Sequence, residues 1–141
     1  MKQNVHVKNK PHVGVGVIIK QNQQIILGRR LNQPMPGSWQ LPGGWIGFGE
    51  TPEQTVQRHL SLFKQLRFGD SKFVTYTNNV FDRNTHSLSL YFMVDCLNAD
   101  PQTLLSNEQN SDWLWADWNE LPQPLFLPLH LLKESEFNPF R

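Results

Sequence analysis

Several features that would assign a protein to a class are absent from this 141-residue sequence. The single cysteine, Cys96, excludes an internal disulfide framework. No apolar run approaches the roughly 18 residues of a transmembrane helix, and the first residues contain no apolar stretch of signal-peptide length. A formal net charge of +1 argues against binding nucleic acid through bulk charge. We therefore expect a cytoplasmic protein without a membrane anchor or a nucleic-acid-binding surface.

Acidic residues are missing from the first third of the chain. All twelve Asp and Glu lie at or after Glu50, whereas six of the thirteen Lys and Arg lie in residues 1–49. A segment with only positive charge is suited to an anionic ligand. The alternative is a chance distribution that includes a solvated N-terminal tail. We expect residues 1–10 to form a flexible tail and residues 11–141 to form a single domain.

The rest of the pattern predicts short strands with two helices among them. Alternation of β-branched and polar residues, interrupted by polar or glycine-rich turns, is typical of strands joined in hairpins. In the first predicted strand, Gly14 and Gly16 face the same side, which indicates that another backbone or a ligand approaches closely. The predicted strands cover residues 12–20, 25–30, the start of 38–50, 72–81, 87–96 and 112–118.

The first helix has a well-marked beginning. Thr51 and Gln54 have the spacing of a capping box, and Pro52 occupies the first helical position. We expect this helix to continue to about Gln65. A second helix is predicted over residues 124–134, where a proline at 128 is tolerated only in the first turn. The order of elements predicts an α/β fold with helices on the faces of a mixed sheet.

The segment from Gly44 to Glu50, followed by Arg58, Leu60 and Leu66, resembles the signature of the Nudix family. The adjoining LPGG and FGE sequences are similar to those of MutT-like members. Further segments that resemble the plant cytosolic Nudix hydrolases are residues 75–81, 108–122 and 124–140. The resemblance covers roughly residues 11–140. It implies the Nudix fold, an α/β/α sandwich around a mixed β-sheet.

The resemblance also implies a chemistry. Members of the family are Mg²⁺-dependent hydrolases of a nucleoside or other diphosphate linked to a second group, and glutamates on the helix of the motif bind the metal. Carboxylates spaced by three and four residues share one helix face and supply hard oxygen ligands. Here the three positions are occupied by His59, Leu62 and Phe63, and no Asp or Glu occurs between Glu53 and Asp70. We therefore expect binding of a nucleotide or other diphosphate, with Mg²⁺-dependent hydrolysis weak or absent.

Two carboxylates keep an active enzyme open as an alternative. Glu50 is either a surviving catalytic group or the partner of Arg58 in an ion pair that ties the loop to the helix. Glu108 occupies a loop position that in some relatives serves the metal or the catalytic water, and is otherwise a solvated loop residue. Together the two glutamates would support hydrolysis of a nucleotide or isoprenoid-like diphosphate, with Mg²⁺ or Mn²⁺ held mainly by the substrate's phosphates.

The resemblance assigns a ligand-binding set as well. Some of these positions hold the base or the apolar group in relatives, while the two neighbouring arginines are candidates for phosphate contact or simply exposed side chains. The set comprises Arg29, Arg30, Gln40, Leu41, Gly43, Gly44, Asn78 and Phe126.

A third function remains open, that of a protein-interaction module. It rests on the apolar residues Leu62 and Phe63 and on the tryptophan-rich strand over residues 112–118. Core packing explains the same tryptophans without a partner. Because similar family members are homodimers, we also expect a homodimer.

Overall fold

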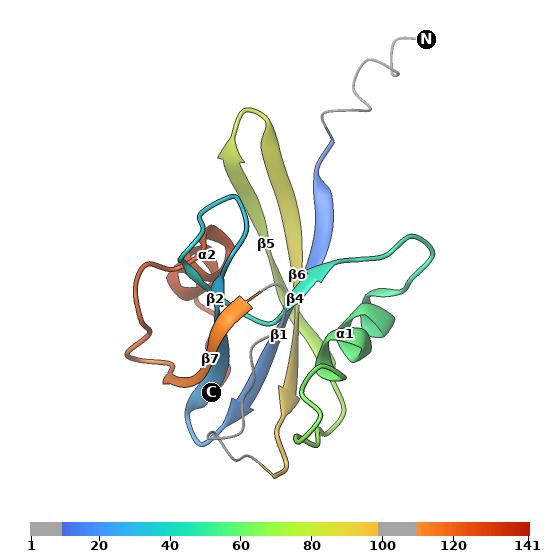
Figure 1. The fold of residues 1–141 in the computed structure, drawn as a ribbon, viewed down its shortest axis with the longest axis vertical. Coiled ribbons are helices and arrows are strands. Elements are labelled where there is room, and N and C mark those ends of the chain that lie inside the picture. Colours follow the sequence, from blue (N-terminus) through green and yellow to red (C-terminus); the bar gives the residue numbers. More distant parts are fainter. Residues whose placement is uncertain (1–9, 99–109) are drawn as a thin grey trace.

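The computed structural model describes residues 10–98 and 110–141. These residues form a seven-stranded mixed sheet with a helix on either face (Figure 1). The strands are β1 (His12–Gln21), β2 (Gln24–Arg30), β3 (Trp39–Gln40), β4 (Gly43–Trp45), β5 (Lys72–Asp82), β6 (Thr85–Asp95) and β7 (Asn110–Asp117), and the helices are α1 (Pro52–Leu60) and α2 (Leu127–Glu134). The predicted α/β sandwich is confirmed.

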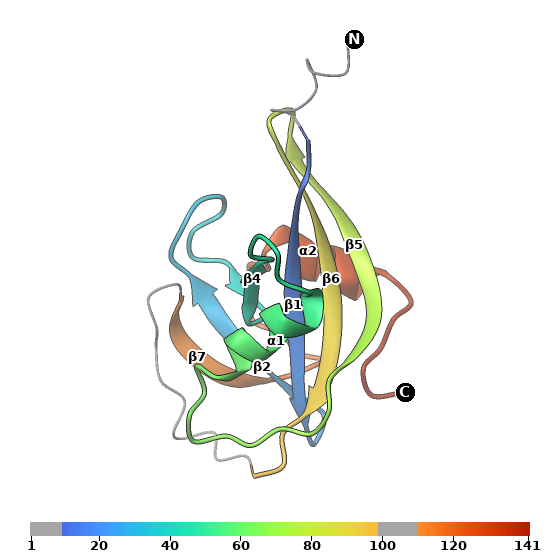
Figure 2. The same ribbon diagram turned by 90° about the vertical axis from the view of Figure 1, so that its right-hand side faces the viewer.

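The central strand β1 holds the sheet together. It pairs in parallel with β6 from His12–Ser87 to Lys20–Asp95, and antiparallel with β2 and β4. The main path of strands runs β3-β2-β1-β6-β5, with β7 paired to β2, so β5 lies at an edge (Figure 2). The predicted hairpins β1–β2 and β5–β6 are both present. In the described part of the chain, no helix is long and apolar enough to cross a membrane.

Alternate side chains of β1 enter two different cores. Val15, Val17 and Ile19 pack beneath α1, whereas Ile18 belongs to the core beneath α2. Side chains alternate between the faces of a strand, which explains this division. Trp113 and Trp115 of β7 pack against the α1-side core. Trp118 belongs to the other core, so the aromatic residues of this region are used inside the domain.

The two glycines of β1 are closely approached, as predicted. A Cβ atom at Gly14 would lie 3.0 Å from the carbonyl oxygen of Gly44. A Cβ atom at Gly16 would lie 2.9 Å from the ring of Tyr91. The absence of side chains here lets β4 cross close to β1 and leaves space on the α2 side of the sheet.

Helix α1 begins as predicted and ends earlier. The Thr51 hydroxyl accepts a hydrogen bond from the Gln54 amide at 3.0 Å, and the Gln54 side chain accepts one from the Thr51 amide at 2.9 Å. The predicted end near Gln65 is wrong, because the helix ends at Leu60. Beyond it the backbone forms tighter turns, in which the Phe63 amide donates to the Leu60 carbonyl at 3.1 Å.

The burial of Phe63 accounts for this early end. Its ring packs edge-on against Trp113, with 4.9 Å between centroids, and lies in the α1-side core. The Ser61 hydroxyl donates to the Arg58 carbonyl at 2.6 Å, which offers the backbone a local alternative to further helix. Helix α2 begins at Leu127 with Pro128 in its first turn, as the sequence requires.

Candidate ligand-binding site

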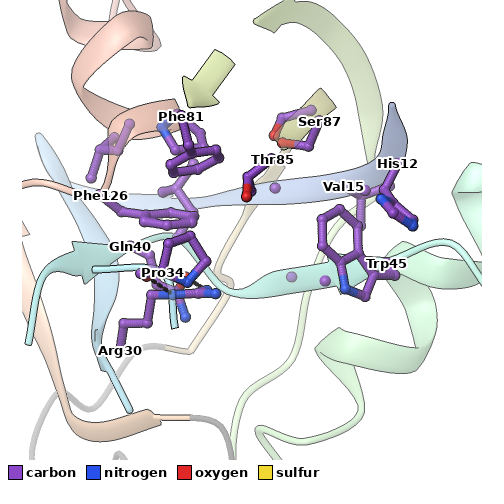
Figure 3. Close-up of a pocket in the computed structure, with 18 of the residues that line it drawn as sticks. His12, Val15, Arg30, Pro34, Gln40, Trp45, Phe81, Thr85, Ser87 and Phe126 are labelled. Atoms are coloured by element: carbon purple, nitrogen blue, oxygen red, sulfur yellow. Dashed lines mark hydrogen bonds between the residues drawn. The ribbon is translucent and has the colours of Figure 1, made fainter. Parts of the chain in front are cut away.

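A cavity of about 460 Å³ lies between the β5–β6 hairpin, β4 and the start of α2 (Figure 3). This volume falls in the range of about 300–1,000 Å³ usual for small-molecule sites. Arg30, Phe81 and Phe126 lie on one side, and His12 and Trp45 lie on the other. The glycines of β1 and β4 line the space between the two groups. The cavity therefore has two side walls that are rich in aromatic rings.

The guanidinium of Arg30 is held in place by the wall around it. It donates to the carbonyl oxygens of Pro34 and Gln33, both at 2.7 Å, and to the side-chain oxygen of Gln40 at 2.9 Å. It also stacks over the ring of Phe126, with 4.2 Å to the centroid. Burial lowers the pKa of Arg30. No carboxylate of the described residues forms an ion pair with it, so its positive charge is available to attract an anion.

The aromatic rings form pairs on both sides of the cavity. Phe81 and Phe126 are 5.4 Å apart between centroids, and His12 and Trp45 are 5.5 Å apart. Trp45 is largely exposed. Flat rings at these separations offer faces and edges against which a planar ligand packs well.

Hydroxyl groups line the side of the cavity formed by β6. Ser87 and Ser89 accept hydrogen bonds from the Asn79 amide at 3.0 and 2.9 Å, and the Thr77 hydroxyl donates to the same side chain at 2.7 Å. Asn79 is fully buried. Burial raises the pKa of Tyr91 to about 12, so its phenol stays protonated at neutral pH. This layer is polar, uncharged and rigidly hydrogen-bonded.

Six of the eight residues assigned to ligand binding by resemblance line the cavity. These are Arg30, Gln40, Leu41, Gly43, Gly44 and Phe126. Five of them come from β2, β3, β4 and the link between β3 and β4, and Phe126, just before α2, is distant in sequence and adjacent in the fold.

The other two residues of the assigned set, Asn78 and Arg29, do not line the cavity. Asn78 is exposed on the opposite face of β5, where its side-chain oxygen accepts from the His86 ring at 2.6 Å. Its neighbour Asn79 faces inward, because one residue along a strand reverses the face. Arg29 stacks over the Trp39 ring at 5.1 Å and lies 3.9 Å from an Asp112 carboxylate oxygen.

Sequence reasoning missed the residues that β6 contributes. Ser87, Ser89 and Tyr91 all line the cavity. A signal was present, since polar side chains at every second position of Ser-Leu-Ser-Leu-Tyr mark one face of a strand. The contribution of His12 and Phe81 had no comparable sequence signal.

Glu50 is fully engaged by hydrogen bonds. Arg58 donates to it at 2.8 and 2.9 Å, the Thr55 hydroxyl at 2.6 Å and the Gly47 amide at 2.8 Å. These bonds, that of Arg58 above all, hold the pKa of Glu50 well below its usual range. Arg58 also donates to the Trp45 carbonyl at 3.2 Å. The ion pair predicted with Arg58 is present and supports the loop beside the cavity, while Glu108 lies outside the described residues.

None of His59, Leu62 and Phe63 lines the cavity. His59 is buried behind Gly44, and its Nδ1 donates to the Thr55 carbonyl at 3.0 Å. Leu62 lies beyond the end of α1 and is exposed. The prediction that these three positions share one helical face is therefore wrong. Across residues 10–98 and 110–141, no group of three His, Cys, Asp or Glu side chains is placed to hold a metal ion.

The buried imidazole of His59 makes stability depend on pH. Burial lowers the pKa of His59, so the unfolded chain binds a proton that the folded chain rejects. We expect the free energy of unfolding to fall as the pH is lowered below about 6.5, by at most about 1.4 kcal/mol per pH unit. Urea unfolding at a series of pH values measures this dependence. The lowered pKa of Glu50 also makes the free energy of unfolding fall with pH, but only below the ordinary carboxyl pKa of 4.5.

His59→Gln is the control for this dependence. The variant should lose most of the slope between about pH 6.5 and pH 5, a window bounded by the ordinary pKa values of histidine and of the carboxylates. If the variant keeps the wild-type slope, another group is responsible and the prediction is wrong.

Comparison with known proteins agrees with this architecture. Residues 10–134 match the NUDIX domain family. An ADP-ribose pyrophosphatase of Methanocaldococcus jannaschii is 28% identical over 128 residues, which are 88% of this chain and 72% of that protein. An 8-oxo-dGTP diphosphatase of Proteus vulgaris is 44% identical over 54 residues, which are 38% of this chain and 48% of that protein.

Solved structures show the same fold. A MutT NUDIX hydrolase from Burkholderia pseudomallei superposes with a TM-score of 0.72 at 22% identity, over 89% of this chain and 99% of that chain. The NUDIX domain of Shewanella oneidensis NrtR, solved with ADP ribose, gives 0.66 at 22% identity, over 95% and 96%. The family match spans most of the sequence, and the fold agrees with it. This chain belongs to the NUDIX domain family.

Proposed function

We propose that this protein binds a nucleoside diphosphate compound in the cavity and hydrolyses it weakly or not at all. The observation that carries the proposal is the combination of two aromatic walls with the charge of Arg30, which no carboxylate of the described residues pairs. A nucleobase packs against aromatic rings, and a diphosphate is attracted to a guanidinium. The relatives described as an ADP-ribose pyrophosphatase and an 8-oxo-dGTP diphosphatase support a ligand of this class.

The side chains near α1 that could bind a metal support the proposal that hydrolysis is weak or absent. Mg²⁺, which the family resemblance implies, prefers oxygen ligands, and neither Leu62 nor Phe63 supplies one. The His59 ring is a poor ligand for Mg²⁺, and one of its nitrogens is already bonded to the Thr55 carbonyl. Both carboxylate oxygens of Glu50 are occupied by donors from the protein. The described residues do not fit the metal, and we propose that the Nudix motif is degenerate in this chain.

The experiment that tests the proposal combines two measurements on the purified protein. Phosphate release is followed with Mg²⁺ or Mn²⁺ and a panel of normal and oxidised nucleoside triphosphates, nucleoside diphosphate sugars, ADP-ribose and geranyl diphosphate. We expect no saturable turnover. We also expect some of these compounds to raise the melting temperature, since a ligand at about 100 times its Kd stabilises the folded state by about 2.7 kcal/mol.

The two alternatives predict different outcomes. An active hydrolase that uses Glu50 and Glu108 gives saturable turnover, which Glu50→Gln abolishes and the control variant Glu53→Gln preserves. A protein-interaction module gives neither turnover nor thermal stabilisation by any compound. Either result contradicts the proposal.

Further properties are proposed by similarity to family members. We propose that residues 11–141 form one domain, that the protein lies closest to the plant cytosolic branch and that it is cytoplasmic. Support comes from the segments that resemble that branch and from the single cysteine, which is typical of a reducing compartment.

A further inference from the structure

The floor of the cavity, between its two side walls, is formed by β1 and β6. Gly14 of β1 lies in register with Ser89 of β6, and Gly16 lies in register with Tyr91. Ser87 precedes them on the same face of β6, and all five residues line the cavity. Figure 3 shows Ser87 in the space between the two walls. Because the two glycines carry no side chains, a flat ring can lie against this floor beside the serine hydroxyls.

A buried asparagine fixes how the hydroxyl of Ser87 is used. The Asn79 side chain is inaccessible to solvent, and its amide nitrogen donates to Ser87 Oγ at 3.0 Å and to Ser89 Oγ at 2.9 Å. Its oxygen accepts a hydrogen bond from the Thr77 hydroxyl at 2.7 Å, which fixes the orientation of the amide. An amide nitrogen donates and does not accept, so Ser87 is the acceptor in its bond with Asn79 and keeps its own hydrogen to donate elsewhere.

The two serines differ in where their hydroxyl hydrogens go. Ser89 hydrogen-bonds the Tyr91 phenol in the sense that favours the ionised phenol, so Ser89 is the donor in that bond. The Ser87 hydroxyl bonds to Asn79 and to no other described side chain. Ser87 is only 5% exposed and lines the cavity. Its hydroxyl hydrogen is therefore the one that this pair of serines offers to a ligand.

This hydrogen restricts the chemistry of the ligand. A base that covers the floor shields Ser87 from water, so the base itself must accept the hydrogen or leave it without a partner. A carbonyl oxygen accepts it. An amino group brings a second donor to a hydroxyl that already accepts from Asn79, and the Ser87 hydrogen then stays buried without an acceptor.

We propose that Ser87 selects ligands whose base carries a carbonyl group over ligands with an amino group at the same position. The selection rests on the proposed binding of a nucleoside diphosphate compound in the cavity. Asn79 is the positioning residue, because its amide holds the Ser87 hydroxyl in the role of donor towards the ligand.

Two pairs of nucleotides test the selection on the wild-type protein. Inosine diphosphate and ADP carry a carbonyl and an amino group on the same purine carbon, and UDP and CDP differ in the same way on a pyrimidine carbon. In each pair that binds, isothermal titration should give a dissociation constant about tenfold lower for the carbonyl member. Equal or reversed constants, or no binding of any of the four, overturn the selection. The proposed function itself fails only if no compound of the thermal screen binds.

Ser87→Ala assigns the preference to this hydroxyl. The variant should bring the ratio of the dissociation constants of ADP and inosine diphosphate from about ten to about one. Ser89→Ala is the matched control, because it removes another acceptor of the Asn79 amide but not the hydrogen offered to the ligand. Its ratio should stay at the wild-type value even if both affinities fall. A preference that survives Ser87→Ala, or that Ser89→Ala abolishes equally, contradicts the assignment. The wild-type ratios need no variant, so they decide the selection even if Ser87→Ala does not fold.

Discussion

Replacing Gly43 with alanine should destabilise the fold by about 3 kcal/mol or more and abolish ligand binding. Gly43 has φ +145°, a backbone conformation that side chains disfavour. An added Cβ would overlap the carbonyl oxygen of Val15 and lie 3.0 Å from its carbonyl carbon. Both atoms belong to the backbone of β1, which pairs with β4 at this point, so neither can move without disturbing the pairing. Equilibrium unfolding in urea measures the loss.

Gly37→Ala is the matched control for this prediction. Gly37 also has a positive φ, +87°, but no atom lies within 4 Å of the position of its added Cβ. The control should lose only about 1 kcal/mol, from backbone strain alone. Similar losses in the two variants would show that close packing against β1 contributes nothing at Gly43.

Replacing Arg30 with lysine should weaken ligand binding at least about tenfold and reduce stability by about 2 kcal/mol. The ammonium of the new lysine is not planar. It cannot replace the guanidinium hydrogen bonds to Pro34, Gln33 and Gln40 and also stack over the Phe126 ring. The partly buried oxygens of Pro34 and Gln40 would lose their donors. Isothermal titration with a nucleotide from the thermal screen gives the affinity, and urea unfolding gives the stability.

The neighbouring arginine supplies the control. Arg29→Lys keeps the charge at a more exposed position, where the ion pair with Asp112 is long at 3.9 Å. Its effect on stability should stay within about 0.5 kcal/mol, and ligand affinity should not change. Equal losses of affinity in the two variants would mean that the position of Arg30 in the cavity wall contributes nothing specific to ligand binding.

Interactions between near neighbours were predictable from the sequence. The capping box of Thr51 and Gln54 depends on residues three apart, and the hairpins depend on alternation and turn residues within a few positions. The close approach at Gly14 and Gly16 was predictable for the same reason, because a missing side chain on one strand face has a limited set of causes. The family motif located Glu50 and Arg58, which the structure joins.

The end of α1 depended on contacts beyond the local sequence. Helix propensity continues past Leu60, but Phe63 gains more by packing on Trp113, 50 positions later. Propensity is a weak preference, and tertiary burial outweighs it. The inward face of β5 was equally undecidable between Asn78 and Asn79, because two adjacent asparagines look alike until the register with β6 is known.

Amino-acid order alone specified the elements of this protein, its α/β class and its family, because these follow from local patterns and from a motif. The tertiary structure decided which of two adjacent arginines faces the cavity, since Arg30 is held by Phe126, 96 positions away. It also brought Ser87, Ser89 and Tyr91 to the ligand site through the parallel pairing of β6 with β1. Long-range strand pairing and burial determine where each of these side chains points, and neither can be predicted from the local sequence pattern.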